Sequence, residues 1–204
     1  EALETADAVM QFIQDTAHDA SRNLAEEKGV FGNYDQSVYK DRGIKYRNAT
    51  TTTIAPTGTL SILAGCSSGI EPLFALSFVR NVMDNDKLLE VNPYFEKKAA
   101  ERGFYSHELM DTIAKTGSIR ELEEIPEDVR QVFATAHDVS PEWHIRMQAA
   151  FQKHTDNAVS KTVNLPHDAT ENDVAKVYNL AFELGCKGVT IYRDGSKENQ
   201  LLSF

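Results

Sequence analysis

Cysteine is scarce in this 204-residue chain, and its two copies, Cys66 and Cys186, lie far apart. Two distant cysteines exclude a disulfide-rich scaffold and form no CxxC metal or redox motif, so we expect both thiols to be reduced and buried. Long apolar runs are also missing, because no eighteen consecutive residues are apolar, and this argues against a membrane-spanning helix. The amino-terminal stretch carries acidic residues where a signal peptide carries basic ones, so we expect a cytoplasmic protein.

A surplus of positive charge is absent as well, since 21 Lys and Arg residues stand against 31 Asp and Glu residues, for a net charge of −10. A phosphate backbone or an anionic membrane surface requires a positive partner, so we expect neither nucleic acid nor membrane as a partner. A Walker loop and a GxGxxG fingerprint are both missing. An anionic ligand must therefore be held locally, by another kind of motif.

The composition, with 41% hydrophobic residues, is that of a globular protein with a sizeable core. Apolar residues at three- and four-residue spacing predict a long amino-terminal helix that ends near Gly29. Strands are predicted at 49–56, 73–83, 158–166 and 186–193, and helices at 84–103, 106–117, 125–137, 140–154 and 170–185. Trp143, Met147 and Phe151 share one face of the helix at 140–154. Strands that alternate with helices indicate an α/β fold.

The segment APTGTLSILAGCSSGIEP, residues 55–72, is rich in glycine, serine, threonine and proline and follows the first predicted strand. Gly58 allows a ligand to approach the backbone closely, and Thr57, Thr59 and Ser61 offer hydroxyl donors. If a helix begins near Gly58, its unpaired N–H groups point toward the end of the strand. These residue types are typical of a phosphate site, and equally of an ordinary strand-to-helix corner with good capping residues.

Weaker interpretations concern other residues. The pentapeptide GCSSG matches the G-x-S-x-G elbow of serine hydrolases with Ser67 as nucleophile, but an elbow requires a helix directly after it and Pro72 disfavours one. His107 and Asp111 share one face of a predicted helix, yet two candidate metal ligands without a third indicate a solvated surface. His144 is expected at a helix surface or in the core with a hydrogen-bond partner. We therefore expect no metal site.

Four segments carry a more specific signal: AEEKGVFGNY, NATTTTIAPTGTLSILAGCSSGIEPLFAL, HDVSPEWHIRMQAAFQKHTDNAVSKTVNLP and LAFELGCKGVTIYRDGS. In this order they resemble the large chain of ribonucleotide reductases, specifically those of the adenosylcobalamin-dependent class. The resemblance covers nearly the whole chain, so it does not depend on a single motif.

The resemblance implies the second half of the ten-stranded reductase α/β barrel, so residues 1–204 would form the carboxy-terminal half of the catalytic barrel. Within it lie a phosphate-binding corner at 55–72, a helical block at 84–154 between strands, and a final strand, helix and strand at 158–193. In the family this corner holds the phosphates of the substrate through backbone N–H groups and hydroxyls. The residues at the matching positions are Pro56, Thr57, Gly58, Thr59, Leu60 and Ser61.

The resemblance also implies the reduction of ribonucleotides to deoxyribonucleotides by thiyl-radical chemistry, with adenosylcobalamin in the complete enzyme. In the di-iron class two consecutive tyrosines relay a radical, but the matching pair here is Ile191 and Tyr192, so the relay is broken and the cobalamin class is favoured. The family's catalytic cysteines and glutamate match no segment of this chain, and Cys66 and Cys186 take none of those roles. We therefore expect no catalytic residue here and an isolated chain that is inactive.

The expected partners are the ribonucleotide substrate, the remaining half of the reductase chain and, for the isolated piece, a second copy in a homodimer. Because the chain begins with Glu1 rather than Met, we expect a piece of a longer protein. An alternative is a non-catalytic partner chain of a split reductase, which would supply the same phosphate contacts and scaffold.

Overall fold

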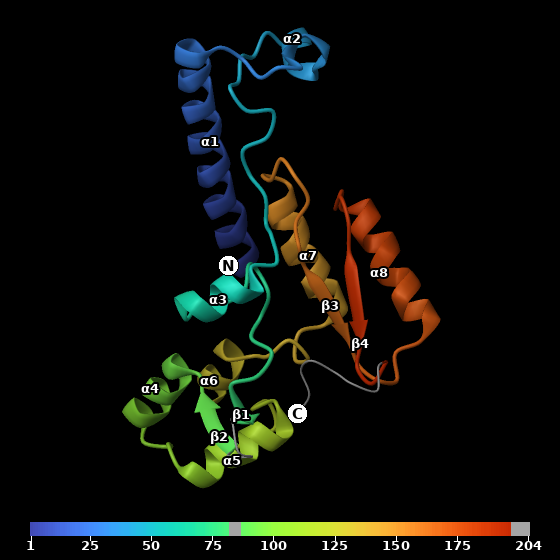
Figure 1. Ribbon diagram of the computed structural model, residues 1–204. Coiled ribbons are helices and arrows are strands. Elements are labelled where there is room, and N and C mark those ends of the chain that lie inside the picture. Colours follow the sequence, from blue (N-terminus) through green and yellow to red (C-terminus); the bar gives the residue numbers. More distant parts are fainter. Residues whose placement is uncertain (82–86, 197–204) are drawn as a thin grey trace. The chain divides into compact units, whose positions relative to one another are not determined.

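The computed structural model describes residues 1–81 and 87–196 (Figure 1). In chain order the elements are α1 (Ala2–Lys28), the 3-10 turn η1 (Tyr34–Gln36), α2 (Val38–Asp41), α3 (Gly58–Ala64), β1 (Ser77–Asn81), β2 (Lys87–Val91), α4 (Pro93–Arg102), α5 (His107–Thr116), α6 (Glu127–Val132), α7 (Pro141–Gln152), β3 (Thr162–Leu165), α8 (Glu171–Glu183) and β4 (Thr190–Arg193). They belong to two compact units. The first comprises Glu1–Ile70, Glu142–Val163 and Glu171–Thr190, and the second comprises Glu71–Pro141, Asn164–Thr170 and the chain from Ile191.

Helix α1 in the first unit has the predicted extent, because it ends at Gly29, which has a φ of 79°. The buried positions of this helix are Ala6, Met10, Ser21 and Ala25. Among them, Ser21 accepts a hydrogen bond from the N–H of Asn48 (3.1 Å), so this part of α1 packs against the segment before the first predicted strand. Near the start of α1, Asp7 accepts hydrogen bonds from Lys153 (2.9 Å) and pairs with His154 (3.2 Å), both of which follow α7.

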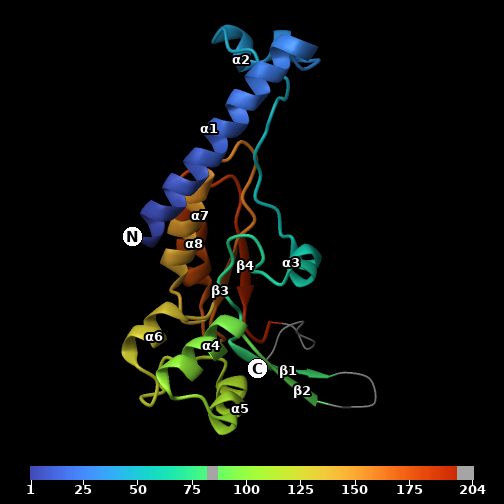
Figure 2. The same cartoon turned by 90° about the vertical axis from the view of Figure 1, so that its left-hand side faces the viewer.

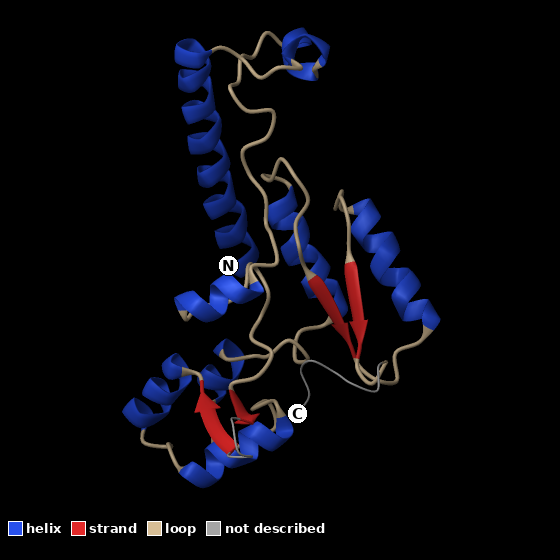
Figure 3. Cartoon of the chain, in the orientation of Figure 1, coloured by secondary structure: helices blue, strands red, loops and turns tan. Residues whose placement is uncertain are grey.

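The first predicted strand, at 49–56, is an extended segment with a single parallel bridge, between Ile54 and Val159. The N–H of Ser160 donates to the carbonyl of Ile54 (2.8 Å). The two carboxy-terminal strands are confirmed in shorter form as β3 and β4, which pair with each other. Figure 3 shows their arrows running in the same direction, joined through α8 as a parallel crossover requires.

Helix α7 buries a mostly polar face, and its buried residues are His144, Ile145, Gln148 and Gln152, whereas Trp143 is 55% exposed. The fully buried Gln148 donates from Nε2 to the carbonyls of Val159 (3.2 Å) and Gly188 (2.6 Å). A buried carbonyl without a partner is costly, so the glutamine amide stabilises the chain just before β3 and β4. An apolar side chain at this position could not do so.

His144 lies on the same buried face and is 1% exposed. Its Nδ1 is 2.8 Å from Nζ of Lys161, which is itself buried and also donates to the carbonyl of Thr162. Burial of an ammonium group requires such partners. The prediction of a core histidine with a hydrogen-bond partner is confirmed.

The second unit contains an antiparallel hairpin of β1 and β2, with Ser77 opposite Val91 and Asn81 opposite Lys87. The sequence predicts a helix from Asp84 onward, and this is wrong for β2. Pairing with β1 determines the conformation of β2, and such a tertiary contact overrides a local helical pattern. Positions 84–86 of that prediction, and the end of the predicted strand at 73–83, lie outside the described residues.

Helices α4 and α5 begin and end at residues suited to those positions. Asn92 accepts a hydrogen bond from the N–H of Phe95 (3.1 Å), and Ser106 accepts one from the chain at the start of α5. Gly103 and Gly117 end the two helices in the left-handed conformation. The predicted helix at 106–117 is confirmed, whereas the one at 84–103 is present only from Pro93. Helix α6 is shorter than predicted.

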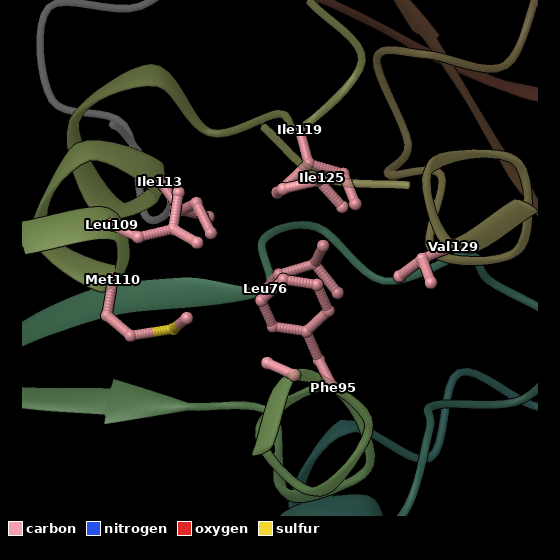
Figure 4. Packing of buried hydrophobic residues seen from close by; sticks show 9 residues of the cluster. Leu76, Phe95, Leu109, Met110, Ile113, Ile119, Ile125 and Val129 are labelled. Atoms are coloured by element: carbon pink, nitrogen blue, oxygen red, sulfur yellow. The ribbon is translucent and has the colours of Figure 1, made fainter. Parts of the chain in front are cut away.

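One apolar cluster forms the core of the second unit (Figure 4). Side chains from α4, α5 and α6, and from the loops beside them, converge there with Leu76, which directly precedes β1. The buried members are Leu76, Phe95, Ala99, Leu109, Met110, Ile113, Ile119, Ile125 and Val129. Helix α5 packs on the β1–β2 hairpin, which Figure 2 shows from the side. The short helices are thus stabilised by tertiary packing rather than by their length.

Candidate phosphate-binding site

The corner that follows Ile54 has an unusual backbone. Helix α3 begins at Gly58, which meets the condition that the sequence analysis set for open N–H groups here, and the preceding Thr57 has φ 52° and ψ 26°. Within residues 1–81 and 87–196, Thr57 is the one non-glycine residue with a positive φ. A β-branched residue in this left-handed region is strained by about 1–3 kcal/mol, and such strain concentrates at functional sites. Neighbouring contacts must hold Thr57 in this conformation.

Three backbone amides are open at this corner. The first hydrogen bond of α3 runs from the N–H of Ser61 to the carbonyl of Thr57 (2.8 Å). The N–H groups of Gly58, Thr59 and Leu60 precede it and donate to no backbone group in the described part of the chain. Consecutive open amides at the positive end of a helix attract an anion.

The predicted site residues contribute unequally to this arrangement. Pro56 has no N–H and can only shape the loop. The Thr57 side chain is half-buried and that of Thr59 is exposed, so both hydroxyls remain candidates. Ser61 is buried, and its hydroxyl donates to the carbonyl of Gly58 (2.7 Å). In this structure the Ser61 hydroxyl is therefore engaged within α3.

The fold itself does not require glycine at position 58. Its φ is not positive, and a Cβ built on Gly58 would have no atom within 4 Å. Gly65, which ends α3 with a φ of 61°, has by contrast a backbone that favours glycine. The absence of a side chain at Gly58 therefore leaves the amides accessible rather than serving the packing of the chain.

The segment that leads to the corner is anchored by Asp156, a residue that the sequence analysis did not single out. Its carboxylate accepts hydrogen bonds from the N–H (2.7 Å) and the hydroxyl (2.9 Å) of Thr51, and lies 3.0 Å from Nε2 of His18 on α1. Burial acts to raise the pKa of Asp156, but these hydrogen bonds outweigh it and hold the pKa below its ordinary value. A single aspartate in a loop carries no motif or periodicity that could reveal this role.

The structure does not support the serine-hydrolase interpretation. Ser67 follows helix α3 rather than a strand, and no helix begins directly after it in the described chain. A nucleophile elbow requires a strand, the serine and a helix directly after one another, and these do not occur in that order here.

The residues that the structure describes form neither a metal-binding site nor a paired-cysteine redox site. His107 and Asp111 lie on α5, and no group of three His, Cys, Asp or Glu side chains could hold a metal in the described ranges. Both cysteines are free. Cys66 is exposed, which corrects the prediction of burial, whereas Cys186 is partly buried and burial raises the pKa of its thiol.

None of the described helices is both long and apolar enough to cross a membrane.

The described chain combines helices with a parallel pair of strands, β3 and β4, and the corner after Ile54 presents three open backbone amides. A family model described as "Ribonucleotide reductase, barrel domain" matches residues 42–192. The chain therefore belongs to the ribonucleotide reductase barrel-domain family, and the fold class expected from the sequence is confirmed.

Individual relatives agree with this family. The vitamin B12-dependent ribonucleoside-diphosphate reductase of Thermoplasma acidophilum is 55% identical over 203 residues, and that of Mycobacterium tuberculosis is 48% identical over 204 residues. Each match covers 100% of this chain but only 26% and 29% of those relatives, so the chain spans just over a quarter of their length. The structure of the Actinobacillus ureae class Id ribonucleotide reductase alpha subunit matches with a TM-score of 0.78 and 26% identity, over 95% of this chain and 34% of that one.

Proposed function

We propose that this chain is a segment of the catalytic barrel of an adenosylcobalamin-dependent ribonucleotide reductase and that it holds the phosphates of the substrate. The observation that carries the proposal is the 55% identity, over the whole chain, to a protein named as a vitamin B12-dependent ribonucleoside-diphosphate reductase. The complete protein would convert ribonucleotides to deoxyribonucleotides in the cytoplasm. The relatives carry the matched segment within longer chains, so they lend no support to a separate partner chain of a split reductase.

The corner from Pro56 to Ser61 would bind the substrate through the open N–H groups of Gly58, Thr59 and Leu60. Phosphate oxygens accept hydrogen bonds from such amides, and the start of α3 adds a positive field. Held by its phosphates, the nucleotide would present its sugar to groups on the rest of the protein. Positioning of this kind lowers the barrier of a reaction whose reacting atoms must come within contact distance.

Adenosylcobalamin would supply the radical when it is bound to the complete protein. The corrin ring of the cofactor itself coordinates the cobalt ion, and the open amides of the corner suit phosphate oxygens. We assign no contact with the cofactor to residues of this chain. Its part in the reaction is to hold the substrate and to complete the barrel.

The remaining part of the reductase chain would cover apolar side chains that the first unit leaves open. Phe12 on α1 is 71% exposed, Ile62 on α3 is 75% exposed and Phe182 on α8 is 85% exposed. Large apolar side chains exposed on several helices of one unit mark surfaces that associate. When the remaining part is missing, a second copy of the chain would cover them in a homodimer.

A substitution at Gly58 tests the site. In the complete protein, Gly58→Val puts a branched side chain beside the open amides, and a Cβ at this position has no neighbour within 4 Å, so we expect the fold to persist. Loss of one hydrogen bond to a charged phosphate should weaken binding of a ribonucleoside diphosphate about 10- to 100-fold in isothermal titration. Gly32→Val is the matched control, because Gly32 is equally free of neighbours within 4 Å and lies outside the corner. Equal affinities in the two variants would refute the site.

A further inference from the structure

We infer that Ser68 is a positioning residue that holds the phosphate-binding corner in its active shape, an inference that rests on the proposed function. Ser68 lies in the loop after α3, where the chain turns back toward the end of the first strand. Its hydroxyl donates a hydrogen bond to the carbonyl of Pro56. Nothing in the sequence distinguishes it from the neighbouring Ser67.

A second contact brings the same loop against the same segment. Gly69 has a φ of 53°, and a Cβ built on it would lie 3.3 Å from the carbonyl oxygen of Ala55 and 3.6 Å from Cγ2 of Ile54. Gly69 is thus glycine for two reasons, its left-handed backbone and its close approach to the strand. The loop therefore bonds to Pro56 through Ser68 and approaches Ala55 closely at Gly69.

The contact with Pro56 bears directly on the strained residue. The carbonyl of Pro56 belongs to the peptide group that ends in the N–H of Thr57, so a hydrogen bond to that carbonyl fixes the orientation of this peptide plane. Rotation of the plane changes the φ of Thr57, which is held at 52° although a β-branched residue disfavours it. The conformation of Thr57 sets the direction in which the open amides at the start of α3 face relative to the preceding segment.

The hydroxyl of Ser68 faces the carbonyl of Pro56 and not the open amides, so we assign it no contact with the substrate. Its removal should let the corner relax and lower the affinity for phosphates. The chemistry at the sugar should be unaffected, because the groups that react lie elsewhere in the complete protein. We therefore expect Ser68→Ala to raise KM with little change in kcat, as loss of substrate binding without loss of chemistry requires.

The experiment uses the complete reductase that carries this segment and a ribonucleoside diphosphate as the probe. Ser68→Ala should weaken binding about 3- to 10-fold, the value expected for one neutral hydrogen bond. Ser67→Ala is the matched control, because Ser67 is exposed and the structure shows no hydrogen bond of its hydroxyl among the described residues. A second pair of variants controls for the shape of the side chain. Ser68→Thr keeps the hydroxyl and should bind the probe like the parent protein, whereas the equally branched Ser68→Val should bind it like Ser68→Ala.

The Gly58→Val variant distinguishes the failure of this inference from the failure of the site. If Gly58→Val weakens binding while Ser68→Ala binds like Ser67→Ala, the corner binds phosphate and the role of Ser68 is refuted. If Gly58→Val has no effect, the site is refuted and the role of Ser68 with it. If Ser68→Ala lowers the melting temperature, equal affinities of the Thr and Val variants would refute the inference, and weaker binding by Val alone would support it.

Discussion

Replacement of Asp156 by alanine should release α1 from the rest of the first unit. The Asp156 side chain is 9% exposed, and it accepts two hydrogen bonds from Thr51 and lies within 3.0 Å of His18. Hydrogen bonds to a charged group contribute about 1.5–3 kcal/mol each, and removal of one partner of a buried pair costs about 3–5 kcal/mol. Because these bonds share one carboxylate, their energies do not add, and we expect a local loss of about 3 kcal/mol.

Amide hydrogen exchange of the complete protein measures this loss directly, since it reports local opening without requiring two-state unfolding. A loss of about 3 kcal/mol corresponds to exchange about 100-fold faster in α1 and in the segment before the corner. Asp19→Ala is the control on the same helix, because Asp19 is 65% exposed and pairs with the exposed Arg22. A surface pair of this kind contributes about 0–1 kcal/mol, so its removal should change exchange by less than about fivefold.

The comparison can refute the role of Asp156. Equal protection of α1 in the Asp156→Ala and Asp19→Ala proteins would show that the carboxylate does not hold the helix. The double variant His18→Ala with Asp156→Ala separates the two contacts. If His18 acts through Asp156, the double variant should lose less protection than the two single losses combined.

Because the pKa of Asp156 is lowered in the folded chain, its stabilising contribution is complete above the pKa of an unfolded aspartate and is lost as the pH falls through the lower folded value. Protection of α1 should therefore decrease below about pH 4 in the parent protein and much less in Asp156→Asn, and parallel pH profiles would contradict this. The isolated 204-residue chain should associate in light scattering and should form no deoxyribonucleotide with adenosylcobalamin and a dithiol, because Cys66 and Cys186 lie far apart and form no redox pair. Deoxyribonucleotide that disappears in Cys66→Ser would overturn the assignment of that cysteine.

Local chemistry made several elements predictable from the sequence. The stripe of α1 stops at Gly29, and Ser106 and Gly117 enclose α5 with residues that favour the two ends of a helix. These signals act within a few residues of the positions that they determine. The start of α3 at Gly58 carried no such signal, because Thr57 forms no side-chain cap.

Features that depend on distant contacts were not predictable. Strand β2 forms only because β1 lies beside it, and the helix-like pattern before Pro93 carries no trace of that pairing. The buried face of α7 is polar because Gln148 serves two carbonyls that belong to other segments. The left-handed backbone of Thr57 contradicts the preference of its own side chain, so a propensity argument predicts the opposite.

Gly58 and Gly69, the two glycines at the corner, are glycine for different reasons. Gly69 is required by its φ of 53° and by the carbonyl of Ala55 at 3.3 Å, so a library of variants screened only for folding should retain it. Gly58 meets neither restriction, and alanine in a helix is favoured over glycine by about 1 kcal/mol. The same screen should therefore enrich alanine at position 58, whereas a screen for growth that requires the reductase should enrich glycine there. Two such screens, compared position by position, would map which residues of this chain serve the ligand and which serve the fold.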